Sequence, residues 1–553
     1  MAEMKYNLLD EPWIRVMGEN CAVTEVSITD ALINAHRYSA LAGETPAQDV
    51  AILRLLIAIV HTVFYRADES GCPATLTGYD DALDRWEALW HADALPEMPI
   101  RSYLDTWHDR FDLLDPDRPF YQVPEAKIGT PHTAAKLNGT ILQSENKIRV
   151  FSGRTSETSG TLSIAEAARW LIYLQGFDDA SVKPKTEAGK KNVKNKPGSA
   201  RGWLGNLGVI YTLGDSLFQT IMLNLFFLKD GAELYSQPKP CWERESPWTT
   251  EYAYIPVPDN IPELFTLQSR RVLLERVENQ ILGFMEYCGG LIDPKNAFDE
   301  PMTVWRPIKE KNKIVGYIPK PHAAARKLWR DFSTVAIQSE ENRRPGVTNW
   351  LTSLQEQRCL SEAFLIRFSA VTAHYDSSGS SVTDTTSDSL SFHADLLTEV
   401  GGAWQLKIKD QIEFADKAAY VLSILAGELA IAAGMREISN GKAVPADRMS
   451  AAEKAKTQYY YRIDEAFRKW LLKPEAGQNA DIRDELCSDW RATAVCIARE
   501  VAREEVDRTG LPALTGRWVE IEKNGAATKR HYSAAEAYNR FNSRIKKLME
   551  GGT

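Results

Sequence analysis

The sequence predicts an α+β protein, with a large mixed α/β region over residues 1–402 and a four-helix bundle over residues 403–553. Three observations lead to this fold class. The chain has 553 residues, which is too long for one hydrophobic core. Strand-like and helix-like segments alternate in its first part, whereas apolar residues recur at helical spacing in its last third. The segment "EVGGAW" marks the junction between the two patterns.

The N-terminal segments alternate between strand and helix patterns. The stretches "NLLDEPWIRVM" and "CAVTEVSITDAL" predict two short strands and the start of a helix, for which Ser27 or Thr29 offers a side-chain oxygen to the free amides. Residues 46–66 predict a strongly apolar helix that begins at Pro46, and residues 76–93 predict a second helix.

The middle of the chain is less regular. Residues 94–160 are rich in Pro, Gly, Asn, Ser and Thr, which predicts loops and short strands. Residues 163–177 predict a helix capped by Ser163, and residues 208–228 predict another apolar helix. Aromatic, proline and basic residues then alternate to about residue 345.

Four apolar stripes predict four amphipathic helices in the last third, because their members are three or four residues apart. The stripes are Phe414, Ala418, Val421, Leu425, Leu429 and Ala432; Tyr460, Ile463, Phe467 and Trp470; Ile482, Leu486, Trp490, Ala494, Ile497 and Val501; and Tyr538, Phe541, Ile545 and Leu548. Modest loops join them, which is typical of a helical bundle.

Composition argues against several classes of protein. No run approaches the ~20 apolar residues of a membrane span, and the start lacks the order of a signal peptide, so we expect a cytoplasmic protein without a membrane partner. The seven cysteines form no C-x-x-C pair and the nine histidines form no H-x-x-x-H pair. We therefore expect free thiols, no metal site and no cofactor.

One loop is strongly basic although the chain has a formal net charge of −9. Residues 181–203 contain one acid and seven basic residues, which are Lys183, Lys185, Lys190, Lys191, Lys194, Lys196 and Arg201. Two interpretations are open: a solvated insertion, or a loop that contacts the phosphates of a nucleic acid. The preceding pair Asp178 and Asp179 could form salt bridges with this loop or accept hydrogen bonds from base amino groups.

A second basic zone lies between residues 306 and 344, which hold ten Lys or Arg and four Asp or Glu. Within it, "IKEKNKIVGYI" predicts a hairpin whose turn is Lys311, Asn312 and Lys313. These lysines either protect an exposed strand edge or contact DNA.

The segment 374–389, "HYDSSGSSVTDTTSDS", is small, polar and turn-forming. Its aspartates Asp376, Asp384 and Asp388 do not have the spacing of a calcium loop. Its small hydroxyl residues suit a loop that enters a duplex and touches phosphates or base edges. The sequence shows no nucleophile–base pair and no Walker-type phosphate loop.

The opening "NLLDEPWIRV" resembles the start of the CasA family, the large subunits of type I-E CRISPR Cascade surveillance complexes. The order of segments that follows is also similar over nearly the whole chain. It comprises an α/β domain, a helix that ends in a loop, an "IKEK"-type hairpin, a polar loop and a four-helix bundle.

The resemblance implies a non-catalytic subunit. Such a subunit recognises the protospacer-adjacent motif in duplex DNA, helps to open the duplex for R-loop formation and recruits the helicase–nuclease. It also implies guide RNA and the backbone and small subunits of Cascade as partners.

By position, the resemblance places the motif-sensing segment on Asp178, Asp179, Ala180 and Ser181, and a lysine finger on Lys311. It places the strand-separating wedge on Ser377, Ser378, Gly379, Ser380 and Ser381. A further DNA-contacting loop falls on residues 151–160 and is led by Phe151. Several relatives have a glycine-rich sensing loop, which this chain lacks, and some carry a C-x-x-C pair that is absent here.

Two other functions remain as alternatives. A metal-dependent nuclease would use Asp376, Asp384 and Asp388. A protein-only scaffold would dock partners through the bundle, but it would not need the basic zones.

Overall fold

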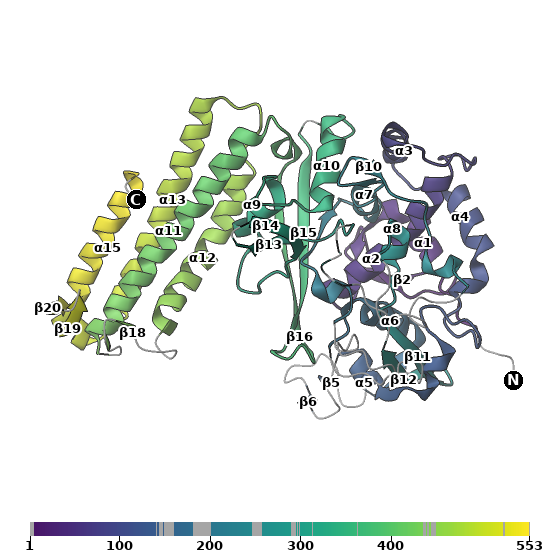
Figure 1. Ribbon diagram of the computed structural model, residues 1–553, viewed down its shortest axis with the longest axis horizontal. Coiled ribbons are helices and arrows are strands. Elements are labelled where there is room, and N and C mark those ends of the chain that lie inside the picture. The colour runs from purple at the N-terminus through teal and green to yellow at the C-terminus, as the bar shows by residue number, and fades with distance from the viewer. Residues whose placement is uncertain are drawn as a thin grey trace. The chain divides into compact units, whose positions relative to one another are not determined.

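The chain divides into two compact units, Met1–Leu390 and Ser391–Thr553, in the computed structural model (Figure 1). The structure describes residues 5–139, 141–142, 147–148, 160–180, 201–245, 257–288, 293, 295, 297, 299–311, 313–361, 363–434, 438–439, 442–443, 449–523 and 526–551. Helices and strands occur together in the first unit and helices dominate the second, which confirms the predicted α+β class.

Small sheets and hairpins make up the strand part of the first unit. One sheet has the order β2-β1-β3, a second has the order β11-β12-β4 with β7 paired to β12, and a third has the order β16-β15-β8. Their strands are β1 Ile14–Gly18, β2 Val23–Val26, β3 Tyr38–Leu41, β4 Thr130–Thr133, β7 Leu162–Ser163, β8 Val209–Leu213, β11 Arg270–Val277, β12 Gln280–Cys288, β15 Leu365–Tyr375 and β16 Val382–His393. Two-stranded pairs are β5 Ile141–Leu142 with β6 Lys147–Ile148, β9 Leu228–Lys229 with β10 Glu233–Leu234, and β13 Trp305–Glu310 with β14 Lys313–Pro319.

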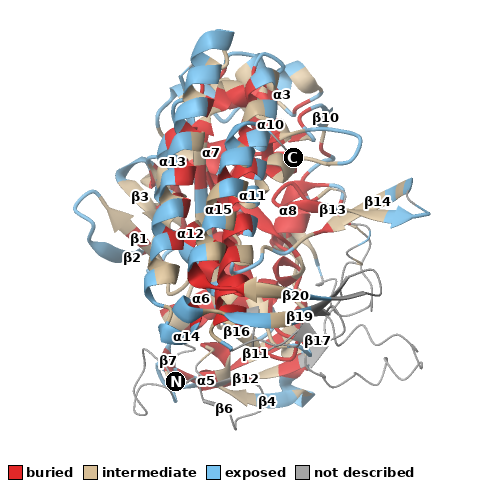
Figure 2. Cartoon of the chain, turned by 90° about the vertical axis from the view of Figure 1, so that its left-hand side faces the viewer, coloured by how far each residue is buried: buried red, intermediate tan, exposed pale blue. Residues whose placement is uncertain are grey.

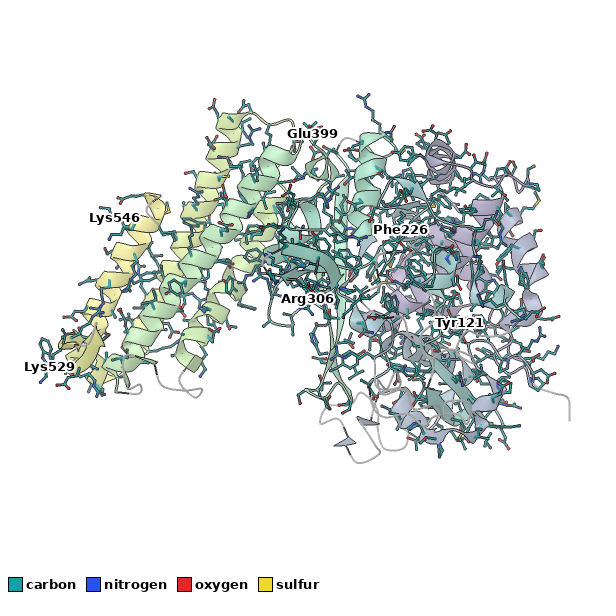
Figure 3. All side chains as sticks on the ribbon, in the orientation of Figure 1. Tyr121, Phe226, Arg306, Glu399, Lys529 and Lys546 are labelled. Carbon is teal, nitrogen blue, oxygen red and sulfur yellow. The ribbon has the colours of Figure 1, made fainter. Side chains whose placement is uncertain are left out.

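The first unit contains one long apolar helix, α2, against which α4, α6, α7 and α8 pack. The helices of this unit are α1 Ile28–Ile33, α2 Pro46–Arg66, α3 Tyr79–His91, α4 Glu97–Thr106, α5 Ala134–Leu137, α6 Ile164–Phe177, α7 Leu217–Leu223, α8 Ile261–Phe265, α9 Phe332–Ala336 and α10 Gly346–Glu356. By length and composition α2 could span a membrane, which corrects the expectation that no run approaches this length. However, 94% of its most apolar window is buried within the protein, as in the core helix of a globular domain. Tyr121 and Phe226, labelled in Figure 3, belong to the same interior.

Helix caps agree with the predicted starts of two helices. Ser27 accepts a hydrogen bond from the amide of Asp30 at the start of α1, and Ser163 accepts one from Glu166 at the start of α6. The cap of α2 is Thr45, directly before the predicted first residue Pro46. Each hydroxyl satisfies an amide that has no partner within its helix.

Two predictions for the first unit are wrong. Residues 208–228 form strand β8 and the short helix α7 instead of one helix, because the β-branched and aromatic run in β8 pairs with β15. Helix α4 lies in a region predicted to contain only loops and strands. It buries Pro99, Ile100 and Leu104, and this short apolar face is hard to recognise in sequence.

Four long helices form the bundle of the second unit: α11 Gly402–Ala432, α12 Met449–Leu471, α13 Ala480–Asp507 and α15 Ala534–Met549. Helix α11 packs against the other three, which run beside it in Figure 1. All six residues of the first predicted stripe are buried, whereas Ile482 of the third is 41% exposed. The sequence analysis missed the insertions in this unit, which are β17 Ile438–Ser439, β18 Lys442–Ala443, α14 Leu511–Thr515, β19 Arg517–Lys523 and β20 Ala526–Tyr532.

Candidate nucleic-acid interface

The sequence-predicted sensing segment begins at the C-terminal end of α6. Asp178 caps this helix, since its amide donates to the carbonyl of Leu174. The side chains of Asp178 and Asp179 are buried, with 4% and 2% exposed. Arg270 pairs with the carboxylate of Asp178, and Lys136 pairs with that of Asp179. The two carboxylates therefore fix the segment within the protein, and they do not present open acceptors to bases.

Arg270 is the central residue beneath this segment, and the sequence analysis did not identify it. Its guanidinium also donates to the carbonyl of Asp179 at 2.9 Å. Its backbone is tied to α6 because its amide donates to Oε1 of Gln175 at 2.8 Å and its carbonyl accepts from Nε2 of Gln175 at 3.0 Å. The only signal in the sequence was an arginine pair at the start of the apolar stretch "RRVLLERV".

The basic loop starts and ends at one place. The amide of Gly202 donates to the carbonyl of Asp178 at 2.9 Å, so the chain returns to the end of α6. A Cβ at position 202 would lie 2.5 Å from the carbonyl oxygen of Gly176, and only glycine permits this approach. The indole of Trp203 then donates to Oε2 of the buried Glu300 at 2.7 Å. The ends of the loop are thus anchored in the core.

Several predicted contact residues cannot be placed. Phe151 and the rest of residues 151–159 lie outside the described residues, as do Ser181, Lys183, Lys185, Lys190, Lys191, Lys194 and Lys196. Arg201 is described, and its guanidinium lies over the ring of Tyr375 at 4.1 Å from the ring centre.

The predicted wedge is a tight turn between β15 and β16. Asp376 organises it: its carboxylate accepts hydrogen bonds from the hydroxyl groups of Ser378, Ser380 and Ser381 and from the amide of Ser380, at 2.8–3.2 Å. Desolvation opposes the charge, but these hydrogen bonds hold the pKa of Asp376 well below its ordinary value. Gly379 has φ +72°, which favours glycine.

Only part of this turn faces solvent. Ser377 and Ser378 are exposed, whereas Ser380 and Ser381 are buried. The polar segment is also shorter as a loop than predicted, because β16 begins at Val382 and includes residues 382–389. The threonines and valine of this stretch suit a strand paired with β15.

The sensing segment and the wedge are in direct contact. The amide of Ala180 donates to the carbonyl of Gly379 at 2.7 Å. A small pocket beside this contact is lined by residues of both segments, including Lys136, Tyr173, Asp179, Ser381 and Thr385. Residues about 200 positions apart thus form one local surface.

Lys311 lies at the tip of the β13–β14 hairpin, as predicted. Because Glu310 pairs with Lys313, Lys311 lies in the connection between the two strands, whereas Lys313 belongs to β14 and not to the turn. Lys311 is exposed and has φ 47°, as the first residue of the favoured two-residue turns does. Figure 2 shows this hairpin projecting with an exposed tip, and Figure 3 labels Arg306 on β13. Among the described residues, no hydrogen bond or ion pair joins Lys311 to the sensing segment or the wedge.

The three aspartates of the nuclease alternative have separate structural partners. Asp376 holds the wedge turn, Asp388 accepts from the amide of Leu328 at 2.7 Å, and Asp384 accepts from the amide of Thr385 at 2.8 Å. In the part of the chain that the structure describes, no three His, Cys, Asp or Glu side chains are grouped as a metal site would require. The geometry therefore offers no support for this alternative.

Sequence comparison identifies the family. The profile of the family described as "CRISPR-associated protein Cse1" matches residues 7–501. The chain belongs to the Cse1 family. This result confirms the resemblance to CasA, because a curated relative carries both names: the CasA/Cse1 protein of Thermus thermophilus is 29% identical over 335 residues. That match spans 60% of this chain and 60% of the relative.

Solved structures of the Cse1 family extend the similarity over the whole chain. Thermobifida fusca Cse1 is 26% identical, with a TM-score of 0.79 and 99% of each chain covered. Acidimicrobium ferrooxidans Cse1 is 24% identical, with a TM-score of 0.73 and coverage of 100% and 98%. A chain of a structure described as a "CRISPR RNA-guided surveillance complex" is 16% identical, with a TM-score of 0.68 and coverage of 98% and 99%. The last two similarities concern the fold alone.

Proposed function

We propose that this protein is the non-catalytic large subunit of an RNA-guided DNA surveillance complex in the cytoplasm. In this proposal it recognises the protospacer-adjacent motif in duplex DNA, helps to open the duplex beside the motif and recruits a helicase–nuclease. Its other partners are guide RNA and the backbone and small subunits of the complex. Membership of the Cse1 family supports the proposal that the protein is part of a surveillance complex. The observation that supports the DNA-opening role is the 2.7 Å hydrogen bond from Ala180 to Gly379, which joins the sensing segment to the wedge.

The proposal gives each segment a physical task. Pairing with guide RNA supplies sequence specificity, so the protein has only to test a short motif and start the opening. Unstacking one step requires a few kcal/mol, and contacts between basic side chains and phosphates offset part of that free energy. A wedge that is already held in one geometry loses little conformational entropy when it enters the duplex.

The contact between Ala180 and Gly379 suits this sequence of events. A motif that binds at the sensing segment would lie close to the turn that would separate the strands, because a hydrogen bond joins the two segments. The basic loop starts and returns beside the same contact, so its lysines would hold phosphates close to the point of opening. Lys311 would approach the duplex from a second, separate tip.

The test is to assemble the full chain with guide RNA and its sister subunits and to measure binding to duplexes that differ only in the motif. We expect at least about fivefold tighter binding to a motif-bearing duplex, since one wrong base pair costs about 1–3 kcal/mol. Permanganate should modify thymines in the first base pairs beside the motif, because it reacts with unpaired thymine. Equal binding to all duplexes would reject the proposal.

A cleavage assay addresses the nuclease alternative. The pure protein should leave DNA intact in the presence of Mg²⁺ or Mn²⁺. Cleavage that disappears on substitution of Asp376, Asp384 and Asp388 would favour the nuclease instead.

A further inference from the structure

Tyr375 connects three segments of the proposed interface, although the sequence analysis assigned it no role. It is the residue directly before Asp376, which organises the wedge turn. Its hydroxyl donates to the carbonyl of Phe177, the last residue of α6, at 2.8 Å. The guanidinium of Arg201 lies over the Tyr375 ring, with the guanidinium carbon 4.1 Å from the ring centre.

These contacts are independent of the backbone hydrogen bond between Ala180 and Gly379. The Tyr375 side chain thereby joins the start of the wedge turn to two other places. These are the C-terminal end of α6, at Phe177, and the end of the basic loop, at Arg201. Burial raises the pKa of Tyr375 well above its ordinary value, so the hydroxyl remains a donor at any physiological pH.

Arg201 also approaches the tip of the turn. An atom added at the Cβ position of Gly379 would lie 3.6 Å from Nε of Arg201 and 3.5 Å from Cβ of Ala180. The guanidinium therefore occupies the space between the ring of Tyr375 and the turn. A planar, delocalised cation suits this place, because it stacks on a ring while its edge still donates hydrogen bonds.

We propose that Tyr375 is a positioning residue for strand separation: together with Arg201 it holds the wedge turn in register with the sensing segment. This inference rests on the proposed function. Tyr375 touches no DNA in this account, and Arg201 acts through Tyr375 instead of as a phosphate contact. Loss of either side chain leaves the wedge folded but held less firmly against the segment that detects the motif, because only the backbone hydrogen bond from Ala180 to Gly379 then remains of these contacts.

The test compares two DNA substrates for the assembled complex. One is a closed duplex that carries the motif, and the other is the same duplex with its first base pairs beside the motif mismatched and therefore already open. Tyr375→Phe removes the hydrogen bond to Phe177 and keeps the ring. We expect about three- to tenfold weaker binding to the closed duplex and less than about twofold change on the open one, as fits the loss of one hydrogen bond.

A matched control removes a comparable hydrogen bond elsewhere. The hydroxyl of Tyr65 donates to the carbonyl of Tyr235 at 2.9 Å, also within the first unit. Tyr65→Phe should bind both substrates as the unaltered protein does. If Tyr375→Phe loses the same factor on both substrates, or loses nothing, the assignment of Tyr375 is overturned.

Arg201→Gln gives a second test that leaves Tyr375 intact. It should also weaken binding to the closed duplex selectively, without changing the slope of log K against log salt. A direct phosphate contact would lower that slope by about one and weaken both substrates, which would contradict the positioning role. Unaltered complexes that show no motif preference would reject the proposed function itself, which is a different outcome.

Discussion

The tips of the β15–β16 and β13–β14 hairpins are both short polar turns, but they are held in different ways. The first, residues 376–381, is bound internally by the Asp376 carboxylate and externally by Ala180. The second presents Lys311 as an exposed residue in a two-residue turn. A turn that must force base pairs apart needs a fixed shape. A lysine that contacts a phosphate or a base edge must instead extend from the protein surface. The difference in bracing therefore matches the two tasks that we propose.

The largest effect is expected beneath the sensing segment, which contacts the braced tip through Ala180. Arg270→Met leaves the buried carboxylates of Asp178 and Glu286 without their arginine, which lies 3.7 Å from Glu286. Removal of one partner from a buried ion pair costs about 3–5 kcal/mol, so the midpoint of urea unfolding should fall clearly. Arg276→Met, at an exposed position of the same strand, should change stability by about 0.5 kcal/mol or less. Similar losses in both variants would show that the site beneath the sensing segment is not specifically braced.

The next effect concerns the wedge turn. Asp376→Ala removes the acceptor of the hydrogen bonds from Ser378, Ser380 and Ser381, so the turn should lose its fixed shape. We expect at least about tenfold less opening of motif-bearing duplexes, as reported by 2-aminopurine fluorescence at the first base pair. Asp384→Ala, on the neighbouring strand, is the control and should open DNA normally. Normal opening by Asp376→Ala would remove the turn from the wedge role.

Neutralising three lysines of the basic loop should have a comparable but less selective effect. Replacing Lys190, Lys191 and Lys194 by Ala should weaken duplex binding on every sequence by about tenfold and flatten the salt dependence, because each lost phosphate contact lowers the slope by about one. A gel-shift series over salt concentration measures both quantities. Unchanged binding would identify the loop as a solvated insertion.

The smallest effect is expected at the free tip. Lys311→Ala removes one exposed charge and should weaken binding to motif-bearing duplexes about threefold, with a smaller loss on random duplex. Competition binding with the two duplexes measures the ratio. Equal losses on both would assign Lys311 to general attraction instead of motif sensing.

Sequence alone predicted the parts of this molecule that depend on local patterns. The bundle stripes, the caps Ser27 and Ser163, the apolar helix 46–66 and the hairpin around Lys311 follow from side-chain periodicity and turn chemistry. Strand β8 was mistaken for helix because its pairing partner, β15, lies about 150 residues away in the chain.

The bracing of the site could not be predicted for the same reason. From the sequence, Asp178 and Asp179 could pair with the basic loop or accept from base amino groups, whereas the fold brings Arg270 and Lys136 against them. Likewise, Tyr375 gains its contacts with Phe177 and Arg201 only after distant segments meet. The family resemblance assigned these segments to one function, but it carried no information on which side chains support them.

One experiment distinguishes the proposed roles of the two hairpin tips most directly. In the assembled complex, binding to a motif-bearing duplex and 2-aminopurine fluorescence of its first base pair are measured together for Asp376→Ala and Lys311→Ala. We predict that Asp376→Ala retains motif-dependent binding but opens little DNA per bound complex, whereas Lys311→Ala binds less selectively but opens each bound duplex normally. If both variants lose binding and opening in the same proportion, the result contradicts the claim that the turn at residues 376–381 opens the duplex while Lys311 senses the motif.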